Sequence, residues 1–162
     1  MKALVVYYSR TGNTKVIADE VAAALGADVE ELKDSKNRQG AIGYMRSGRD
    51  SIRKTKAKLK PTAHNPADYD LVILGGAIWA STICSPTRTY AAEQKGSFKS
   101  VAFFCTSGES DPAGATKGFD ALEEVTGMKP VATLGVGQKE VMIDHEQAVA
   151  DFAASLNSHG KN

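Results

Sequence analysis

The sequence predicts an α/β protein, a three-layer sandwich in which helices cover both faces of a five-stranded parallel sheet. Short runs in which every residue is apolar recur along the chain, and such runs are typical of strands buried on both faces. Segments with helical periodicity separate the runs, and this alternation favours a parallel sheet with right-handed crossovers. The 162 residues suffice for a hydrophobic core but not for two full-sized domains, so we expect residues 1–162 to form a single domain.

Five segments have the length and composition of strands. Residues 3–8 and 71–74 are apolar at every position, whereas residues 28–32 are a weaker candidate. The expected strands, in chain order, are residues 3–8, 28–32, 71–74, 101–105 and 131–136. Because ligands of such sheets bind beyond the carboxyl ends of the strands, a site is expected in the loops after the first, third and fourth strands.

Two helical segments precede the third strand. The first carries its apolar residues on one stripe between Val16 and Leu25, and Gly26 ends it. The second, over residues 41–59, is expected to be an amphipathic helix that is partly buried along a narrow apolar stripe among basic residues. That stripe consists of Ala41, Met45, Ile52 and Leu59.

Three further helical segments follow the third strand. Pro86 can open a helix that continues to Gln94, because proline is favoured in the first turn. Residues 114–126 repeat their apolar positions at helical spacing. The last helix is expected to start at Asp144, with Gln147 three positions later completing a capping-box pattern.

Charge is distributed unevenly along the chain. The net charge is +1, but residues 36–60 hold nine Lys or Arg and a single acidic residue, Asp50. Such a segment can attract nucleic acid, an anionic partner or a dinucleotide phosphate, although a solvated helix face is the commoner explanation. Tyr44 is the only aromatic residue there that could stack on bases, so a nucleic-acid-binding module is the least favoured of the functions considered.

Neither the apolar runs nor the cysteines point to a membrane or to an oxidising compartment. No run approaches the ~18 apolar residues of a membrane span, and the N-terminal strand is not followed by a cleavage site. Cys84 and Cys105 form neither a C-x-x-C pair nor a zinc pattern. We therefore expect a cytoplasmic protein without a membrane span and without a structural metal.

The loop after the first strand has the chemistry of a phosphate site. It places hydroxyl groups, a glycine and free backbone N–H groups at a helix N-terminus, where partial positive charge favours a phosphate. The alternative is that Thr11 or Asn13 merely caps the helix. Arg10 either pairs with the phosphate or points to solvent. The patterns G-x-x-x-x-G-K-[ST] and G-x-G-x-x-G are both absent, which argues against a nucleoside-triphosphate or dinucleotide loop.

The loops after the third and fourth strands offer an aromatic ring and short polar side chains. Trp79, the only tryptophan, is expected in a loop at the ligand-binding edge, where its indole could stack on an aromatic ligand or serve as a core or lid residue. Gly75 and Gly76 allow either close packing or the approach of a ligand to the backbone. Residues 106–111 are rich in hydroxyl groups and could wrap the polar edge of a ring.

Taken together, these motifs resemble the flavodoxin family, and its short flavodoxin-like branch in particular. The resemblance covers almost the whole chain and implies the strand order 2-1-3-4-5, an FMN cofactor and electron transfer through a non-covalently bound flavin. It implies no catalytic residue of the protein and no metal. The resemblance and the loop chemistry together give these expected cofactor-binding residues: Ser9, Arg10, Thr11, Gly12, Asn13, Thr14, Ala77, Ile78, Trp79, Ala80, Ser81, Thr106, Ser107, Gly108 and Asp111.

The turn after the third strand departs from the flavodoxin pattern. In flavodoxin shuttles a glycine beside the flavin often lets a peptide flip, but the segment 79–81 contains none. A positive φ costs a non-glycine residue about 1 kcal/mol or more. We therefore expect this turn to resist the flip.

Two other departures leave a second function open. Residues 106–118 contain no aromatic residue, so the second face of the flavin is expected to be open to nicotinamide or a quinone. The chain is also less acidic than many flavodoxin shuttles, so their partners should not be assumed. The alternative to an electron carrier is an FMN-dependent NAD(P)H:quinone reductase. The expected partner is thus a redox protein, or NAD(P)H and a quinone, with the protein acting as a monomer or a homodimer and without nucleic acid.

Overall fold

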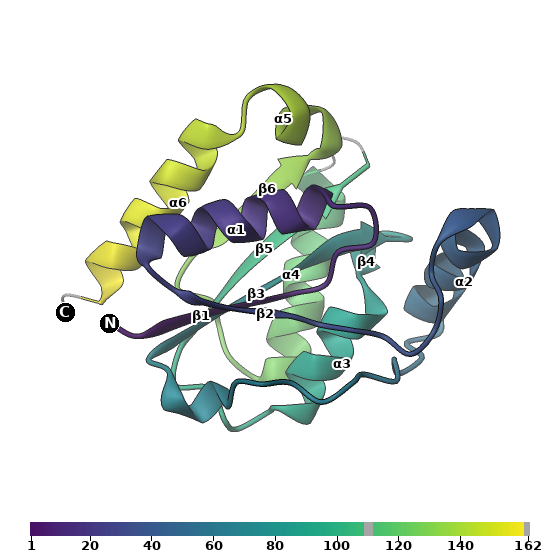
Figure 1. Ribbon diagram of the computed structural model, residues 1–162, viewed down its shortest axis with the longest axis horizontal. Coiled ribbons are helices and arrows are strands. Elements are labelled where there is room, and N and C mark those ends of the chain that lie inside the picture. Colours follow the sequence, from purple (N-terminus) through teal and green to yellow (C-terminus); the bar gives the residue numbers. More distant parts are fainter. Residues whose placement is uncertain (109–111, 161–162) are drawn as a thin grey trace.

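The computed structural model describes residues 1–108 and 112–160, and its sheet has the predicted architecture (Figure 1). The parallel strands lie in the order β2-β1-β3-β5-β6, and a short strand, β4, pairs antiparallel with β3. The strands are Ala3–Tyr7 (β1), Asp28–Glu31 (β2), Leu71–Trp79 (β3), Thr82–Ile83 (β4), Val101–Ser107 (β5) and Thr133–Gly137 (β6). All five predicted strands and their order are therefore confirmed, and β4 is an addition.

Helices cover both faces of this sheet (Figure 1). Side chains of α1, α5 and α6 pack on one face, and side chains of α3 and α4 pack on the other. The helices are Asn13–Leu25 (α1), Gly40–Ile52 (α2), Ser85–Glu93 (α3), Pro112–Thr126 (α4), Gln138–Ile143 (α5) and Glu146–His159 (α6), with a 3₁₀ turn at Pro66–Asp68. Of the helices described, none combines the length and apolar character that crossing a membrane requires.

Strand β1 shows why the central strands are apolar at every position. Val5 and Tyr7 are buried against the layer that contains α1, whereas Leu4 and Val6 are buried in the layer that contains α3 and α4. Alternate side chains thus enter two separate cores, and neither face of the strand can carry a polar residue without burying it.

Two predicted helix boundaries are wrong. Helix α2 ends at Ile52 rather than at residue 59, because Lys54 adopts a left-handed backbone (φ 51°). The capping box expected at Asp144 is absent: α6 starts at Glu146 without a side-chain cap, and the Gln147 amide donates to Asp151 instead. The short helix α5 was not predicted.

Helix α2 reverses the predicted amphipathic orientation. Met45 and Ile52, expected on a partly buried stripe, are 74% and 71% exposed. The face that turns inward is polar and includes Ser47, Asp50 and Ser51. Charge pairing rather than apolar burial therefore attaches α2 to the rest of the protein.

The attachment is a buried ion network around Arg38. Its guanidinium Nε donates to Asp34 at 2.6 Å, and its Nη2 lies 3.2 Å from the Asp50 carboxylate, which also accepts from Lys36 at 3.2 Å. Burial alone would raise the pKa of Asp50, but hydrogen bonds and charges from Lys36 and Arg38 outweigh it and lower that pKa. Asp50 is thus held ionised on the inner face of α2.

A tight turn joins β3 to β4. Trp79 pairs with Thr82, and the two residues between them, Ala80 and Ser81, have φ of 50° and 61°. Two consecutive positive φ angles are the signature of the type I′ turn, whose twist suits a two-residue hairpin. Positive φ angles thus occur here without glycine, because the two-residue hairpin imposes them. The expected resistance of this turn to a peptide flip stays a prediction.

Replacing Ala80 with glycine should stabilise the protein. Relief of ~1–2 kcal/mol of left-handed strain exceeds the ~0.5–1 kcal/mol entropic cost of glycine, so Ala80→Gly should raise the free energy of unfolding by about 0.5–1 kcal/mol. The matched control is Ala154→Gly in the exposed face of α6, which should lower it by about 1 kcal/mol. Urea denaturation measures both, and destabilisation by both would refute the strain.

Replacing Asp50 with asparagine should break the ion network. The loss should be about 3–5 kcal/mol at neutral pH, because Arg38 remains buried with one carboxylate fewer. Because the folded-state pKa of Asp50 is lowered, the ionised carboxylate stabilises the fold above about pH 4, and this stabilisation is lost on further acidification. The free energies of unfolding of variant and parent should therefore converge at acidic pH. The exposed Asp120→Asn serves as control in pH-dependent denaturation; an equal effect of both would contradict the assignment.

Candidate functional site

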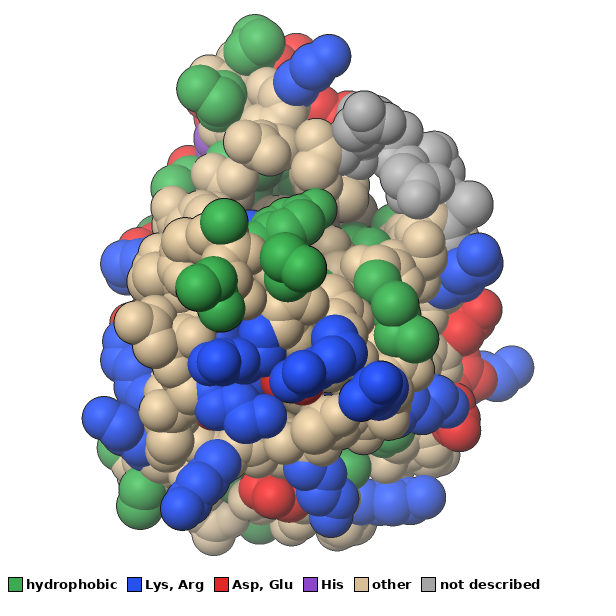
Figure 2. Space-filling view, turned by 90° about the vertical axis from the view of Figure 1, so that its right-hand side faces the viewer, with side chains coloured by type: hydrophobic (Ala, Val, Ile, Leu, Met, Phe, Trp, Pro, Cys, Tyr) green, Lys and Arg blue, Asp and Glu red, His purple; other side chains and the backbone are tan. Residues whose placement is uncertain are grey.

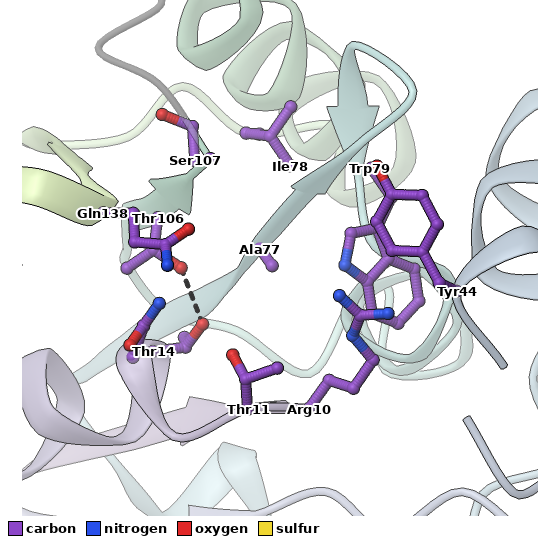
Figure 3. Close-up of a pocket in the computed structure, with 12 residues that line it drawn as sticks. Arg10, Thr11, Thr14, Tyr44, Ala77, Ile78, Trp79, Thr106, Ser107 and Gln138 are labelled. Carbon is purple, nitrogen blue, oxygen red and sulfur yellow. Dashed lines mark hydrogen bonds between the residues drawn. The ribbon is translucent and has the colours of Figure 1, made fainter. Parts of the chain in front are cut away.

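The carboxyl ends of β1, β3, β5 and β6 meet at one edge of the sheet, where they border a cavity of about 240 Å³ (Figure 3). The strand order reverses between β1 and β3, which is where ligands bind in open parallel sheets. The residues that line the cavity are Arg10, Thr11, Asn13, Thr14, Tyr44, Ala77, Ile78, Trp79, Thr106, Ser107, Gly108 and Gln138. Residues from all three predicted loops therefore converge on one site.

The loop before α1 presents an uncapped helix N-terminus to the cavity. Gly12 is the N-cap residue, with φ 104°, and no side chain caps the helix. Ser9 instead stabilises the loop itself, because its hydroxyl accepts a hydrogen bond from the Gly12 N–H at 3.1 Å. The alternative that Thr11 or Asn13 only caps the helix is wrong. The partial positive charge of the helix end is left for a ligand.

A buried hydrogen bond connects α1 to β5 at the floor of the cavity. The hydroxyl oxygens of Thr14 and Thr106 lie 2.7 Å apart. Figure 3 shows this pair on one side of Ala77, with Gln138 next to Thr106 and the aromatic residues on the other side. The cavity thus has a polar end at α1 and an aromatic end at the tip of β3.

Arg10 occupies the aromatic end rather than pointing to solvent. Its guanidinium carbon lies 4.9 Å from the centre of the Tyr44 ring and 5.9 Å from that of Trp79. The Nε of Arg10 is buried and has no hydrogen-bond partner among the described residues. A buried donor without a partner is costly, so Arg10 is suited to a ligand that accepts a hydrogen bond there.

Trp79 is part of the wall and not of a loop. It is the last residue of β3 and only 7% exposed, with its ring edge-on to Tyr8 at 5.7 Å and an interplanar angle of 87°. Arg38 lies 5.4 Å from its ring. The position predicted for Trp79, a loop with a free indole face, is therefore corrected: the long strand β3 carries it into the sheet.

The remaining predicted residues divide between the cavity and its surroundings. Thr106, Ser107 and Gly108 line it, and Asp111 lies outside the described residues. Ala80 and Ser81 form the turn beyond Trp79 and do not line this cavity. Ser9 and Gly12 do not line the cavity but lie in the loop that precedes α1. The Ser9 hydroxyl accepts from the Gly12 N–H, and the left-handed backbone of Gly12 sets the geometry of the α1 end.

Gly75 and Gly76 serve packing. A Cβ on Gly75 would overlap the ring of Phe104, and one on Gly76 would crowd the side chains of Thr87 and Cys84. Neither glycine lines the cavity. Of the two alternatives for this pair, close packing is confirmed.

Two lining residues, Tyr44 and Gln138, were not predicted. Gln138 opens α5 directly after β6, so the same rule that selected the other loops would have found it after the fifth strand. Tyr44 comes from α2, which reaches the site because Gln39 donates to the Arg10 carbonyl at 2.9 Å. No local sequence pattern predicts the contact between Gln39 and the Arg10 carbonyl.

Neither cysteine lines the cavity. Cys84 and Cys105 are buried, and burial raises the pKa of both thiols, that of Cys105 to about 12. Such thiols are poor nucleophiles. Across residues 1–108 and 112–160, no group of three or more His, Cys, Asp or Glu side chains could hold a metal ion. The site is suited to binding an anion joined to a planar ring.

Comparison with known proteins agrees with this geometry. The flavodoxin family model matches residues 2–126. A flavoprotein from Lactobacillus acidophilus, solved in complex with FMN, is 25% identical over 87% of this chain and 96% of that protein, with a TM-score of 0.67. A search of curated protein sequences gave no match.

Two further structures share the fold. A putative flavoprotein from Bacteroides uniformis is 22% identical, with 94% of this chain and 97% of that one covered and a TM-score of 0.78. Flavodoxin 1 from Bacillus cereus is 20% identical, with 98% and 99% covered and a TM-score of 0.58. Since the family model spans most of the chain and the sheet has the order that the family implies, the chain belongs to the flavodoxin family.

Proposed function

We propose that this chain, as a single domain over residues 1–162, binds FMN non-covalently and transfers electrons through it. The observation that carries the proposal is the uncapped N-terminus of α1, which opens into the same cavity as Trp79 and the unpartnered Nε of Arg10. The flavoprotein from Lactobacillus acidophilus that resembles this chain was solved with FMN, which supports the choice of ligand.

The residues present fit such a cofactor. Thr11, Asn13 and Thr14, with the backbone N–H groups of the first turn of α1, would hold the phosphate. The ring would lie among residues 77–79 and 106–108, with Arg10 and Tyr44 near its aromatic end. FMN supplies the redox chemistry when bound, and the protein supplies binding, orientation and electrostatics.

The outer face of α2 favours a protein partner over a small substrate. Ile42, Tyr44 and Met45 are all exposed on it, and Tyr44 also lines the cavity. Figure 2 shows Lys and Arg side chains gathered across the middle of this face of the molecule, with hydrophobic side chains above them. An exposed apolar patch with a charged border is typical of a docking surface.

The expected partner is an acidic redox protein. Residues 36–60 carry nine basic residues, of which Arg38 is buried between Asp34 and Asp50. The others leave a positive field beside the cavity that would steer a negatively charged protein toward the cofactor. The second candidate, an NAD(P)H:quinone reductase, rests on the same positive charge, which could attract a dinucleotide phosphate.

The phosphate should account for the preference for FMN over riboflavin. Thr11→Val removes a hydroxyl that would contact the phosphate, so it should weaken FMN binding about 10- to 100-fold and leave riboflavin binding unchanged. Quenching of flavin fluorescence measures both affinities. Thr62→Val, outside the cavity, is the matched control.

The proposal fails if the purified protein is colourless and added FMN keeps its fluorescence. It also fails if riboflavin binds as tightly as FMN, because the α1 end would then contribute nothing. Mass identification of any chromophore released from the purified protein provides an independent check.

Electron transfer should depend on the basic face. The rate constant for reduction of an acidic iron–sulfur protein should fall about threefold in Arg53→Glu and with added salt, since both weaken steering. Lys129→Glu changes the net charge equally but lies outside residues 36–60, so it should have little effect. Stopped-flow absorbance gives the rates.

A quinone assay distinguishes the electron carrier from the reductase. Steady oxidation of NADPH with a quinone, far faster than with free FMN, would favour the reductase. If Arg53→Glu and Lys129→Glu lower the rate constant for reduction of the iron–sulfur protein equally, docking at α2 is contradicted.

A further inference from the structure

A second cavity lies on the other side of the β3–β4 hairpin from the proposed cofactor site. Its volume is about 440 Å³, and it is bordered by the end of α2, the hairpin turn, α3 and α4. Trp79 lines the first cavity and Ala80 lines the second, so the hairpin separates them. Nothing in the proposed function uses this second cavity.

Arg88 brings a buried positive charge to the cavity wall. The residue is only 7% exposed, and burial lowers the pKa of its guanidinium. Its guanidinium Nη2 donates one long hydrogen bond, of 3.4 Å, to the Thr55 carbonyl. Among the described residues, no carboxylate lies within ion-pair distance of it. Glu124, which lines the same cavity, attracts the guanidinium only from beyond ion-pair distance, so the buried charge is incompletely compensated. A bound anion would offset the remaining cost of burying it.

Ser51 supplies a second, independent indication of a ligand. It lines the same cavity from the end of α2 and is 1% exposed. Its hydroxyl has no hydrogen-bond partner within the described part of the chain. An oxygen atom of a bound anion would accept the hydrogen bond that this buried hydroxyl lacks.

The rim of the cavity is also positive. Lys54 and Lys56 line it together with a single carboxylate, that of Glu124. Lys54 lies 3.7 Å from Glu124, and both side chains are largely exposed, so this ion pair is weak and screened. The lining thus holds three cationic side chains, those of Lys54, Lys56 and Arg88, and one carboxylate. The net positive charge attracts an anion.

The rest of the lining is aliphatic. Ile52 from α2, Ala92 from α3, and Ala121 and Val125 from α4 contribute apolar surface. The cavity therefore offers polar contacts at one part of its wall and apolar contacts at the other, the combination found in sites for small organic molecules.

We infer that this cavity binds a small organic anion, with a carboxylate or phosphate group at Arg88 and Ser51 and an apolar body against the aliphatic wall. The inference does not rest on FMN binding, because the residues that carry it line a different cavity. A ligand here would touch Ala80 and Thr82, and hence the hairpin whose other side forms the cofactor site.

Three probes of similar size test the chemistry of the head group. Benzoate carries a carboxylate, phenyl phosphate carries a phosphate, and benzamide is the uncharged counterpart of benzoate. Their affinities are measured by NMR shift titration of the protein saturated with FMN if it binds FMN, and of the protein as isolated otherwise. At least one anion should bind about tenfold more tightly than benzamide, and the better anion identifies the head group.

Matched variants locate the binding. Lys56→Gln should weaken anion binding about two- to fivefold, whereas Lys58→Gln, which removes the same charge outside the cavity, should not. Ser51→Ala should weaken binding but leave the thermal stability of the free protein unchanged or higher, because it removes an unpaired buried hydroxyl. Arg88→Gln should weaken binding at least tenfold, and circular dichroism checks that this variant is folded.

Several outcomes would overturn the inference. One is that benzamide binds as well as the anions, which would mean a merely apolar cavity. Another is that Lys56→Gln and Lys58→Gln act alike, or that Ser51→Ala leaves binding unchanged. Loss of phenyl phosphate binding in Thr11→Val would place that probe in the cofactor site instead. If FMN fails to bind while the anion effects hold, the proposed function fails alone and this site stands.

Discussion

The buried guanidinium of Arg38 is the contact on which both cavities depend. It joins Asp34, which follows β2, to Asp50 on the inner face of α2, and it lies against the ring of Trp79. A charge in this position is stable only while both carboxylates accompany it, so the network fixes α2 in one place. Helix α2 in turn supplies Tyr44 to the proposed cofactor site and Ser51 to the second cavity.

Attachment by charge also explains the unusual surface of α2. Because its inner face is polar, the apolar side chains that an amphipathic helix normally buries point outward, where they are surrounded by basic residues. The surface proposed for a redox partner is thus the counterpart of the buried network. The left-handed Lys54 that ends the helix then places basic side chains at the rim of the second cavity.

Prediction from sequence succeeded for the sheet and failed for α2 for related reasons. The strands were predictable because burial on both faces demands apolar residues at every position, a signal that is complete within each strand. The stripe of Met45 and Ile52 gave an equally regular signal, but ion pairing with residues 34–38 outweighed apolar burial. Similarly, the hairpin geometry overrode the backbone preference of Ala80 and Ser81.

The sequence by itself determined the parallel sheet and, through the family resemblance, its strand order, and it predicted that the loop of residues 9–14 lies at the carboxyl edge of that sheet. These features depend on local composition and on the rule that the ends of parallel strands share one edge. Only the tertiary structure decided that Arg10 lies between Tyr44 and Trp79, that Gln138 joins the site, and that Arg88 and Ser51 line one second cavity. Contacts between side chains far apart in the chain depend on how the helices pack on the sheet. Neither hydrophobic periodicity nor a short motif predicts this packing geometry.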